Sequence, residues 1–216
     1  AAATTATILI GEFDVDRAVF TGTAGGLHPQ ARVGDIVVAD ALLQHDMDAT
    51  PLFPRHEVPL YGVDRFAADP VLSAALATAA GVVLDAASHE AHDAADAVAE
   101  ARPAATQAAV DGQLLREFGI ASPRVHRGLV VSGDRFVASG AESAELRHRL
   151  PDALAVEMEG AALAQVCHDF GVPFAVVRTI SDRADDSAHV DFSRFVAAVA
   201  SRYTLAIMRR WLRNDG

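Results

Sequence analysis

The sequence predicts an α/β protein with a parallel or mixed sheet, because short apolar runs typical of strands alternate with longer helical segments. The clearest example is a strand pattern over 152–160, a helical pattern over 160–171 and a strongly β-branched strand pattern over 172–182. The chain has 216 residues, of which 51% are hydrophobic, so it is long enough to bury one sizeable core. With no linker or internal repeat, we expect residues 1–216 to form a single domain.

The N-terminal part of the chain begins with residues 1–13, which resemble the tail of a helix with Gly11 just beyond its end. The apolar run at 17–22 predicts a short buried strand that leads into a glycine-rich turn, TGTAGGL. The run at 34–46 predicts a second strand that bends or extends.

The middle and the C-terminal part of the chain contain the longest helical patterns. The alanine-rich segment 69–101 predicts a helix interrupted near Gly81, and 105–119 predicts a helix that ends at a glycine. A strand follows at 124–134, and we expect a long terminal helix over 193–214.

Charge and cysteine content exclude several classes of function. The formal net charge is −11 and all 18 basic residues are Arg, which argues against nucleic acid and anionic membranes as main partners. The single cysteine, Cys167, cannot form an internal disulfide and fits a reducing compartment. No apolar run reaches the roughly 20 residues of a membrane span. We therefore expect a cytoplasmic protein.

Polar residues gather where the predicted strands end, and ligands of α/β sheets bind outside these carboxyl ends. Acidic residues there are expensive to bury without partners, and a ligand rich in hydroxyls and ring nitrogens would supply such partners. This favours a nucleoside or a sugar. In chain order, the strand ends carry TGTAGG, His45-Asp46, Ser132-Gly133-Asp134, Glu157-Met158-Glu159 and Ser181-Asp182.

Taken singly, these features also have plainer interpretations. An acid after a strand is more often a helix N-cap than a catalyst, and a lone Phe is more often a core residue than a stacking partner. The glycine-rich TGTAGG is not a dinucleotide-binding fingerprint. We expect no metal at HDMD (45–48) or at the helix face with His89, His92 and Asp93, because neither spacing is that of a known metal motif.

Four motifs together resemble the 5′-methylthioadenosine/S-adenosylhomocysteine nucleosidases of the nucleoside phosphorylase superfamily. The resemblance is weaker over 63–120. It implies a three-layer α/β/α fold with a mixed sheet, a homodimer, no cofactor or metal, a place in methionine salvage, and hydrolysis of the N-glycosidic bond to adenine in both substrates. The motifs are VFTGTAGGL, VGDIVVAD, RGLVVSGDRF and AVEMEGAALAQVCHDFGVPFAVVRTISDRAD.

The resemblance implies two catalytic carboxyl groups, Asp182 and Glu159. Adenine leaves readily only if N7 is protonated as the bond breaks, and Asp182 would be that acid, oriented by Ser181. The ribose becomes oxocarbenium-like, and Glu159 would hold its hydroxyls and stabilise the positive charge. Met158 would lie against the sugar, and Glu157 near the same hydroxyls.

The other substrate-binding residues follow from the same resemblance. Phe136 would stack on adenine while the Val137 backbone reads the edge of the base, and Phe192 would cover the 5′-thio group. The segment beside the ribose and the attacking water would be Thr23, Ala24 and Gly25.

Three further residues complete this scheme. Arg178 lies in a buried strand pattern, where it either pairs with an acid near the site or is a structural arginine. Ala49 and Leu52 would reach the pocket of a partner subunit.

The resemblance also implies an earlier strand with a glutamate that activates water, and residue 1 of this chain comes after that strand. Glu12 is not that residue, since we place it in a loop between the first helix and the strand at 17–22. Either upstream sequence is omitted or this is a truncated member. We favour omission, because loss of a central strand would expose a long apolar edge.

Other functions remain open at this point. A phosphate-dependent purine nucleoside phosphorylase would share the fold, although Asp rather than Asn at position 182 favours a 6-amino purine. A hydrolase of 6-amino-6-deoxyfutalosine is a close sibling, and a non-catalytic nucleoside-binding protein belongs to a different class. Release of free adenine separates an enzyme from a binding protein, and phosphate dependence separates a phosphorylase from a hydrolase.

Overall fold

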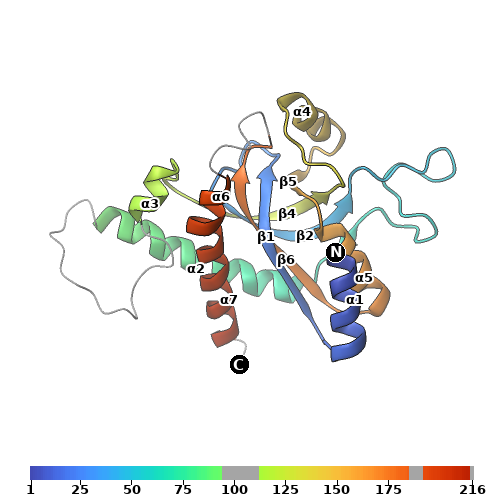
Figure 1. Ribbon diagram of the computed structural model, residues 1–216, viewed down its shortest axis with the longest axis horizontal. Coiled ribbons are helices and arrows are strands. Elements are labelled where there is room, and N and C mark those ends of the chain that lie inside the picture. The colour runs from blue at the N-terminus through green and yellow to red at the C-terminus, as the bar shows by residue number, and fades with distance from the viewer. Residues whose placement is uncertain (94–111, 185–191, 215–216) are drawn as a thin grey trace.

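The computed structural model describes residues 1–93, 112–184 and 192–214, which form helices around a mixed sheet (Figure 1). This confirms the predicted α/β class. The strands are β1 Ala18–Gly26, β2 Ile36–Gln44, β3 Phe66–Ala67, β4 Val125–Ser132, β5 Ala153–Glu157 and β6 Phe174–Asp182. The helices are α1 Ala2–Phe13, α2 Pro70–Asp93, α3 Gly112–Glu117, α4 Gly140–Arg149, α5 Gly160–Phe170, α6 Phe192–Phe195, a π-helical turn Val196–Ala200 and α7 Ser201–Asn214.

The sheet closes on itself, which the sequence did not predict. Its strand order is β3-β2-β4-β5-β1-β6, and β2 also pairs with β6. The β1–β6, β2–β4 and β4–β5 pairs are parallel, whereas β1–β5 and β2–β6 are antiparallel. Closure brings strands that lie far apart in the sequence around a common interior.

The register of this sheet gathers several strand ends at one place. Gly25, near the end of β1, pairs with both Val156 of β5 and Asp182 of β6. Ser132, the last residue of β4, pairs with Glu157, the last residue of β5. The polar residues that the sequence places after separate strands therefore lie close together.

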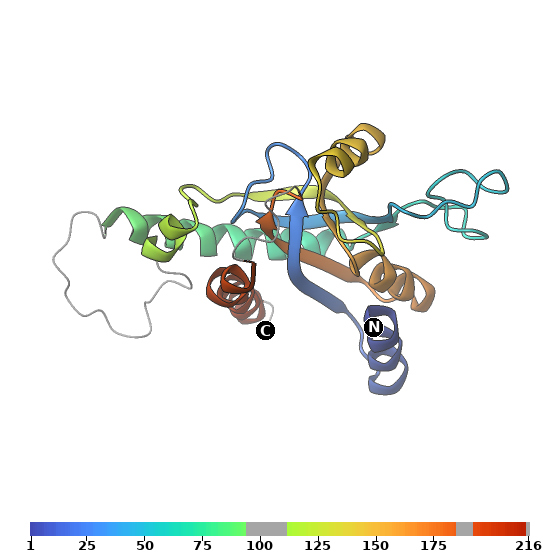
Figure 2. The same ribbon diagram turned by 45° about the horizontal axis from the view of Figure 1, so that its top comes forward.

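Two main groups of buried residues pack on opposite sides of the strands, because successive side chains of a strand alternate between its faces. Val37 and Val176 pack with α1 and α5, whereas Ile36 and Val177 pack with α2 and α7. Figures 1 and 2 both show β1 running between α7 and α1. The strands that carry the site are thus supported from both sides.

Helix α2 contains an 18-residue stretch, Pro70–Ala87, that is long and apolar enough to cross a membrane by length and composition. From the sequence, no apolar run was expected to reach the roughly 20 residues of a membrane span, whereas this stretch comes within the range of such a span by length and composition. Leu72, Leu76 and Leu84 of this helix are buried against the sheet and α7, as in the core helix of a globular protein. Its apolar character has a packing explanation.

Several predicted boundaries at the N-terminal end were wrong. Gly11 lies inside α1, and the helix ends instead at Asp14, which adopts a left-handed conformation (φ 54°). Glu12 consequently belongs to the last turn of α1 and not to a loop. Helix α2 continues through Gly81 without interruption, because one glycine inside a long helix costs only about 1 kcal/mol relative to alanine.

The structure also adds elements that the sequence did not predict, namely β3 and α4. The predicted terminal helix is present but contains the π-helical turn between α6 and α7. Parts of the predicted helices at 69–101 and 105–119, and with them part of the 63–120 region, lie outside the described residues.

The glycine-rich TGTAGG lies within β1 and not in the turn that the sequence predicted. Its glycines make room for neighbouring atoms. A Cβ at Gly22 would overlap Nη1 of Arg178, its partner on β6. A Cβ at Gly26 would overlap the carbonyl oxygen of Ala31. Close approach, not turn geometry, explains these glycines.

We expect Gly22→Ala to destabilise the fold by roughly 1–3 kcal/mol, because the added methyl group displaces the buried Arg178. Gly81→Ala is the matched control: a Cβ there meets nothing within 4 Å, so this helical substitution stabilises the fold by about 0.5–1 kcal/mol. Urea unfolding measures both changes. Effects of the same sign at the two positions would contradict this explanation.

Candidate functional site

A cavity of about 270 Å³ opens where the ends of β1, β5 and β6 meet the segment that follows β4. It also receives the first residue of α6. The lining residues are Thr23, Ala24, Gly25, Arg135, Phe136, Val137, Val156, Glu157, Met158, Glu159, Ser181, Asp182, Ala184 and Phe192.

Every substrate-binding or catalytic residue expected from the sequence lines this cavity except Arg178, which is buried beneath it. Their individual roles stay predictions. The sequence analysis missed Arg135, Val156 and Ala184. All three are immediate or near neighbours of predicted residues within the same motifs, and this adjacency was the available signal.

Asp182 is held in a fixed orientation at the end of β6. Its side chain is almost fully buried; Oδ2 accepts a hydrogen bond from the Ser181 hydroxyl at 2.7 Å, and Oδ1 accepts one from the Ala184 amide at 2.7 Å. A Cβ at Gly25 would lie only 2.9 Å from Oδ1, so the carboxyl group packs directly on the backbone of β1. Each oxygen has bonding capacity left for a ligand.

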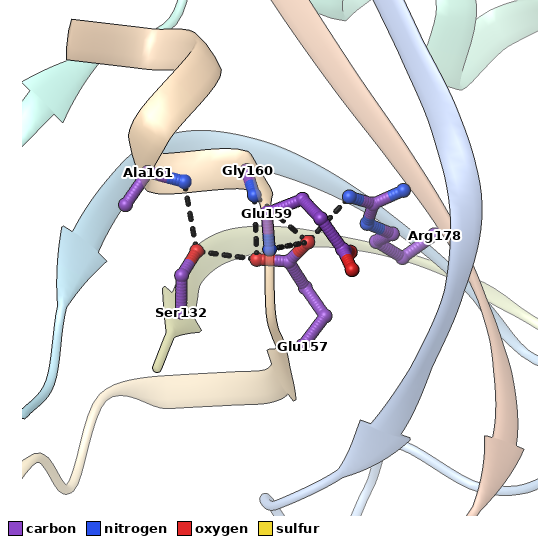
Figure 3. Close-up of polar contacts among 6 residues, drawn as sticks. All are labelled: Ser132, Glu157, Glu159, Gly160, Ala161 and Arg178. Atoms are coloured by element: carbon purple, nitrogen blue, oxygen red, sulfur yellow. Dashed lines mark hydrogen bonds and ion pairs between the residues drawn. The ribbon is translucent and has the colours of Figure 1, made fainter. Parts of the chain in front are cut away.

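Glu157 lies at the centre of a buried polar network (Figure 3). Its carboxylate forms an ion pair with Arg178, and the two side chains are 3% and 2% exposed. It also accepts hydrogen bonds from the Ser132 hydroxyl, from the Gly160 amide at 2.9 Å and from the Glu159 amide at 3.1 Å. Arginine and the N-terminus of α5 together compensate the buried negative charge.

This network changes the expected contacts of Glu157. It lines the cavity as predicted, but its oxygens are engaged by protein donors rather than turned only toward a ligand. The pairing of Arg178 with an acid near the site is confirmed. Ser132 extends the network, because its hydroxyl also accepts a hydrogen bond from the Ala161 amide at 2.8 Å. Glu157 and Ser132 therefore fix the start of α5.

Glu159 occupies the N-cap position of α5, yet its side chain makes no capping hydrogen bond. The plainer interpretation, that this acid serves as a helix cap, is not what the structure shows, because Glu157 accepts the first amide hydrogens instead. Glu159 and Met158 are both exposed at the cavity. The Glu159 carboxylate is thus available to a ligand.

Two aromatic rings border the cavity. Phe136 is 45% exposed and Phe192 is 38% exposed, so neither is the core residue that a lone Phe would predict. Val137 beside Phe136 is buried. A cavity with two accessible rings and two carboxyl groups can hold a flat heterocycle joined to a polyhydroxylated group.

Other candidate residues lie apart from the cavity. Ala49 and Leu52 belong to the segment between β2 and β3, and Leu52 is 84% exposed. Within the described part of the chain, no group of three or more His, Cys, Asp or Glu residues could hold a metal ion. The side chains of His89, His92 and Asp93 lie outside the described residues.

The chain matches the model of a known protein family and is similar to several solved structures. The model of the phosphorylase superfamily matches residues 1–213. A 5′-methylthioadenosine/S-adenosylhomocysteine nucleosidase from Neisseria meningitidis, in complex with methylthio-immucillin-A, is 32% identical with a TM-score of 0.73, and the match covers 99% of this chain and 76% of that one.

Two further solved structures are similar over almost the whole chain. An S-adenosylhomocysteine nucleosidase from Streptococcus pyogenes, in complex with 5-methylthiotubericidin, is 28% identical with a TM-score of 0.71, covering 99% of this chain and 74% of that one. A futalosine hydrolase mutant from Helicobacter pylori is 27% identical with a TM-score of 0.71, covering 99% and 75%.

We expect Glu157→Gln to destabilise the fold by roughly 3–5 kcal/mol, because it leaves the charge of Arg178 buried without a counter-ion. Glu117→Gln is the matched control, since Glu117 pairs with Arg194 at the surface and its loss should cost no more than about 1 kcal/mol. Urea unfolding compares the two variants. Equal losses would show that burial of the ion pair is unimportant.

Proposed function

Because this chain belongs to the phosphorylase superfamily and is similar to its 5′-methylthioadenosine/S-adenosylhomocysteine nucleosidases, we propose that it hydrolyses the N-glycosidic bond of these two nucleosides. The products are adenine and the 5′-thio-ribose. The observation that carries this proposal is the cavity in which Asp182, Glu159 and Phe136 meet. Two similar structures hold methylthio nucleoside analogues, which supports the same class of ligand here.

In the proposed reaction Asp182 is the general acid. The bond between ribose C1′ and adenine N9 breaks, its electron pair moves into the purine, and the proton of the Asp182 carboxyl group passes to N7. Ser181 and the Ala184 amide hold the carboxyl group, which supports this role because proton transfer depends on orientation. A water molecule adds to C1′ and releases one proton to solvent, and the Asp182 carboxylate takes up a proton again before the next turnover.

In the proposed reaction Glu159 interacts with the sugar. Its carboxylate makes no helix-capping hydrogen bond and is exposed at the cavity. There it can accept hydrogen bonds from the ribose hydroxyls and stabilise the oxocarbenium-like charge. Met158 packs on the sugar. Beside it lie Thr23, Ala24 and Gly25, which also line the cavity.

The base and the 5′ group take the apolar parts of the cavity. Phe136 stacks on adenine and the Val137 backbone reads its edge, while Phe192 covers the thioether. The exposure of both rings at the cavity supports these assignments, because aromatic faces favour flat heterocycles and apolar sulfur groups.

We also propose a cytoplasmic homodimer that acts in methionine salvage. The segment between β2 and β3 projects from the rest of the structure (Figure 1) and carries Leu52 and Leu60, which are 84% and 91% exposed. Exposed apolar residues of this kind support a subunit contact, with Ala49 and Leu52 near the partner's cavity. The free, buried Cys167 supports a reducing compartment.

The test is adenine release from 5′-methylthioadenosine without phosphate. We expect release by the wild-type protein and a loss of roughly 10²–10⁴-fold in kcat for Asp182→Asn, since the amide cannot donate the required proton. Asp152→Asn is the control, because Asp152 pairs with Arg65 away from the cavity, and it should retain wild-type activity.

Other outcomes of the same assay identify the rival functions. Release only in the presence of phosphate would indicate a phosphorylase, and tight nucleoside binding without release would indicate a binding protein. Faster turnover of 6-amino-6-deoxyfutalosine than of 5′-methylthioadenosine would assign the chain to the function of its futalosine hydrolase relatives.

A further inference from the structure

The segment Gly133–Val137, the base-side loop, lies between β4 and α4 and carries Phe136 and Val137 into the cavity. Its position sets where these two residues meet a ligand. Two of the contacts that hold its first residues come from outside the cavity, just beyond the end of β2.

The side chain of Asp46 holds the backbone of the base-side loop. Oδ2 of Asp46 accepts a hydrogen bond from the Asp134 amide at 2.7 Å, and Oδ1 accepts one from the Gln44 side-chain amide at 2.6 Å. The neighbouring His45 amide donates to the Ser132 carbonyl oxygen at 2.8 Å. One carboxylate thus joins the end of β2 to the start of the loop.

His45 fixes the loop by filling space. A Cβ at Gly133 would overlap Nε2 of His45 and lie 2.6 Å from Cε1 and 2.9 Å from Cδ2, so the imidazole ring packs directly on the glycine backbone. His45 as a whole is 8% exposed. The Gly133 amide donates to the Glu157 carbonyl oxygen at 3.1 Å, so Gly133 is held between the ring and the end of β5.

We infer that His45 and Asp46 are positioning residues that hold the base-side loop so that Phe136 and Val137 meet the heterocycle of the ligand. They act through the loop, because neither lines the cavity. The identity of the heterocycle rests on the proposed function, whereas the contact between β2 and the loop does not.

His45 performs this role as a neutral ring. Its Nε2 has no hydrogen-bond partner among the described residues, and burial lowers its pKa from the usual 6.5. The charged groups around it are Asp46 on its own segment, Arg149 and Glu142 on α4, and His56 on the segment that follows β2. Protonation would place a charge in a desolvated position beneath the loop, and the attraction of Asp46 and Glu142 does not offset the cost of burial.

The first experiment compares Asp46→Ala, Asp46→Asn and Asp48→Ala. We expect Asp46→Ala to raise KM for 5′-methylthioadenosine about tenfold while kcat changes less than about threefold, because binding of the base is weakened and the acid is untouched. Asp46→Asn keeps an acceptor and should restore most of the affinity. Asp48→Ala is the control, since Asp48 binds the Thr50 amide in the same segment.

A double-mutant cycle tests the ring contact. Gly133→Ala should raise KM, because the added methyl group and the His45 ring occupy the same space. In a His45→Ala background that space is empty, so the second substitution should have a several-fold smaller effect. An equal effect of Gly133→Ala in both backgrounds would overturn the assignment of His45.

Amide hydrogen exchange keeps this inference separate from the proposed function. Peptides that contain the base-side loop should exchange faster in Asp46→Ala and His45→Ala and at the wild-type rate in Asp48→Ala, whether or not the protein releases adenine. Unchanged exchange in both variants would overturn the inference. Absence of adenine release in the wild-type protein would instead overturn only the proposed function.

Titration of His45 should make the stability of the fold depend on pH. The unfolded chain binds the proton near pH 6.5, whereas the folded protein binds it only at lower pH. Stability therefore falls as the pH decreases below 6.5, until the folded pKa is reached. The melting temperature of His45→Gln should depend less on pH over this range than that of the wild type. Identical pH profiles would show that His45 does not titrate as inferred.

Discussion

The buried ion pair between Glu157 and Arg178 is the constraint on which the site depends, because two charges removed from water have to be satisfied completely. Arg178 fits into β6 only because its β1 neighbour is Gly22. Glu157 accepts its remaining hydrogen bonds from Ser132 and from the first amides of α5. The position of α5, and with it the exposed carboxylate of Glu159, follows from this network.

The carboxyl group of Asp182 and the aromatic part of the cavity are held by different sets of contacts. The acid Asp182 is fixed by groups of its own strand end and by the backbone of β1. The aromatic part lies on a loop that β2 holds from behind through His45 and Asp46. The two carboxyl groups proposed as proton donor and sugar ligand therefore lie on the scaffold, while the ring proposed to bind the base depends on contacts made outside the cavity.

The order of the main strands and helices could be predicted from the sequence, because the β-branched runs and the glycines that end them are strong local signals. The sequence also assigned Asp182 and Glu159 to one site, because both lie within the long motif that resembles the nucleosidase family. Features that depend on tertiary contacts could not be predicted from the sequence. The glycines of TGTAGG serve close packing against Arg178, closure of the sheet by β2 and β6 has no local pattern, and Gly133 is explained only by the His45 ring.

Hydrolysis requires that water, and not phosphate, supplies the oxygen that joins ribose C1′ when adenine departs. Reaction of 5′-methylthioadenosine in water labelled with heavy oxygen, followed by mass spectrometry of the sugar product, tests it most directly. Hydrolysis predicts one labelled oxygen in the thio-ribose, with free adenine as the other product. A sugar phosphate without the label, or intact nucleoside after prolonged incubation, would contradict this account.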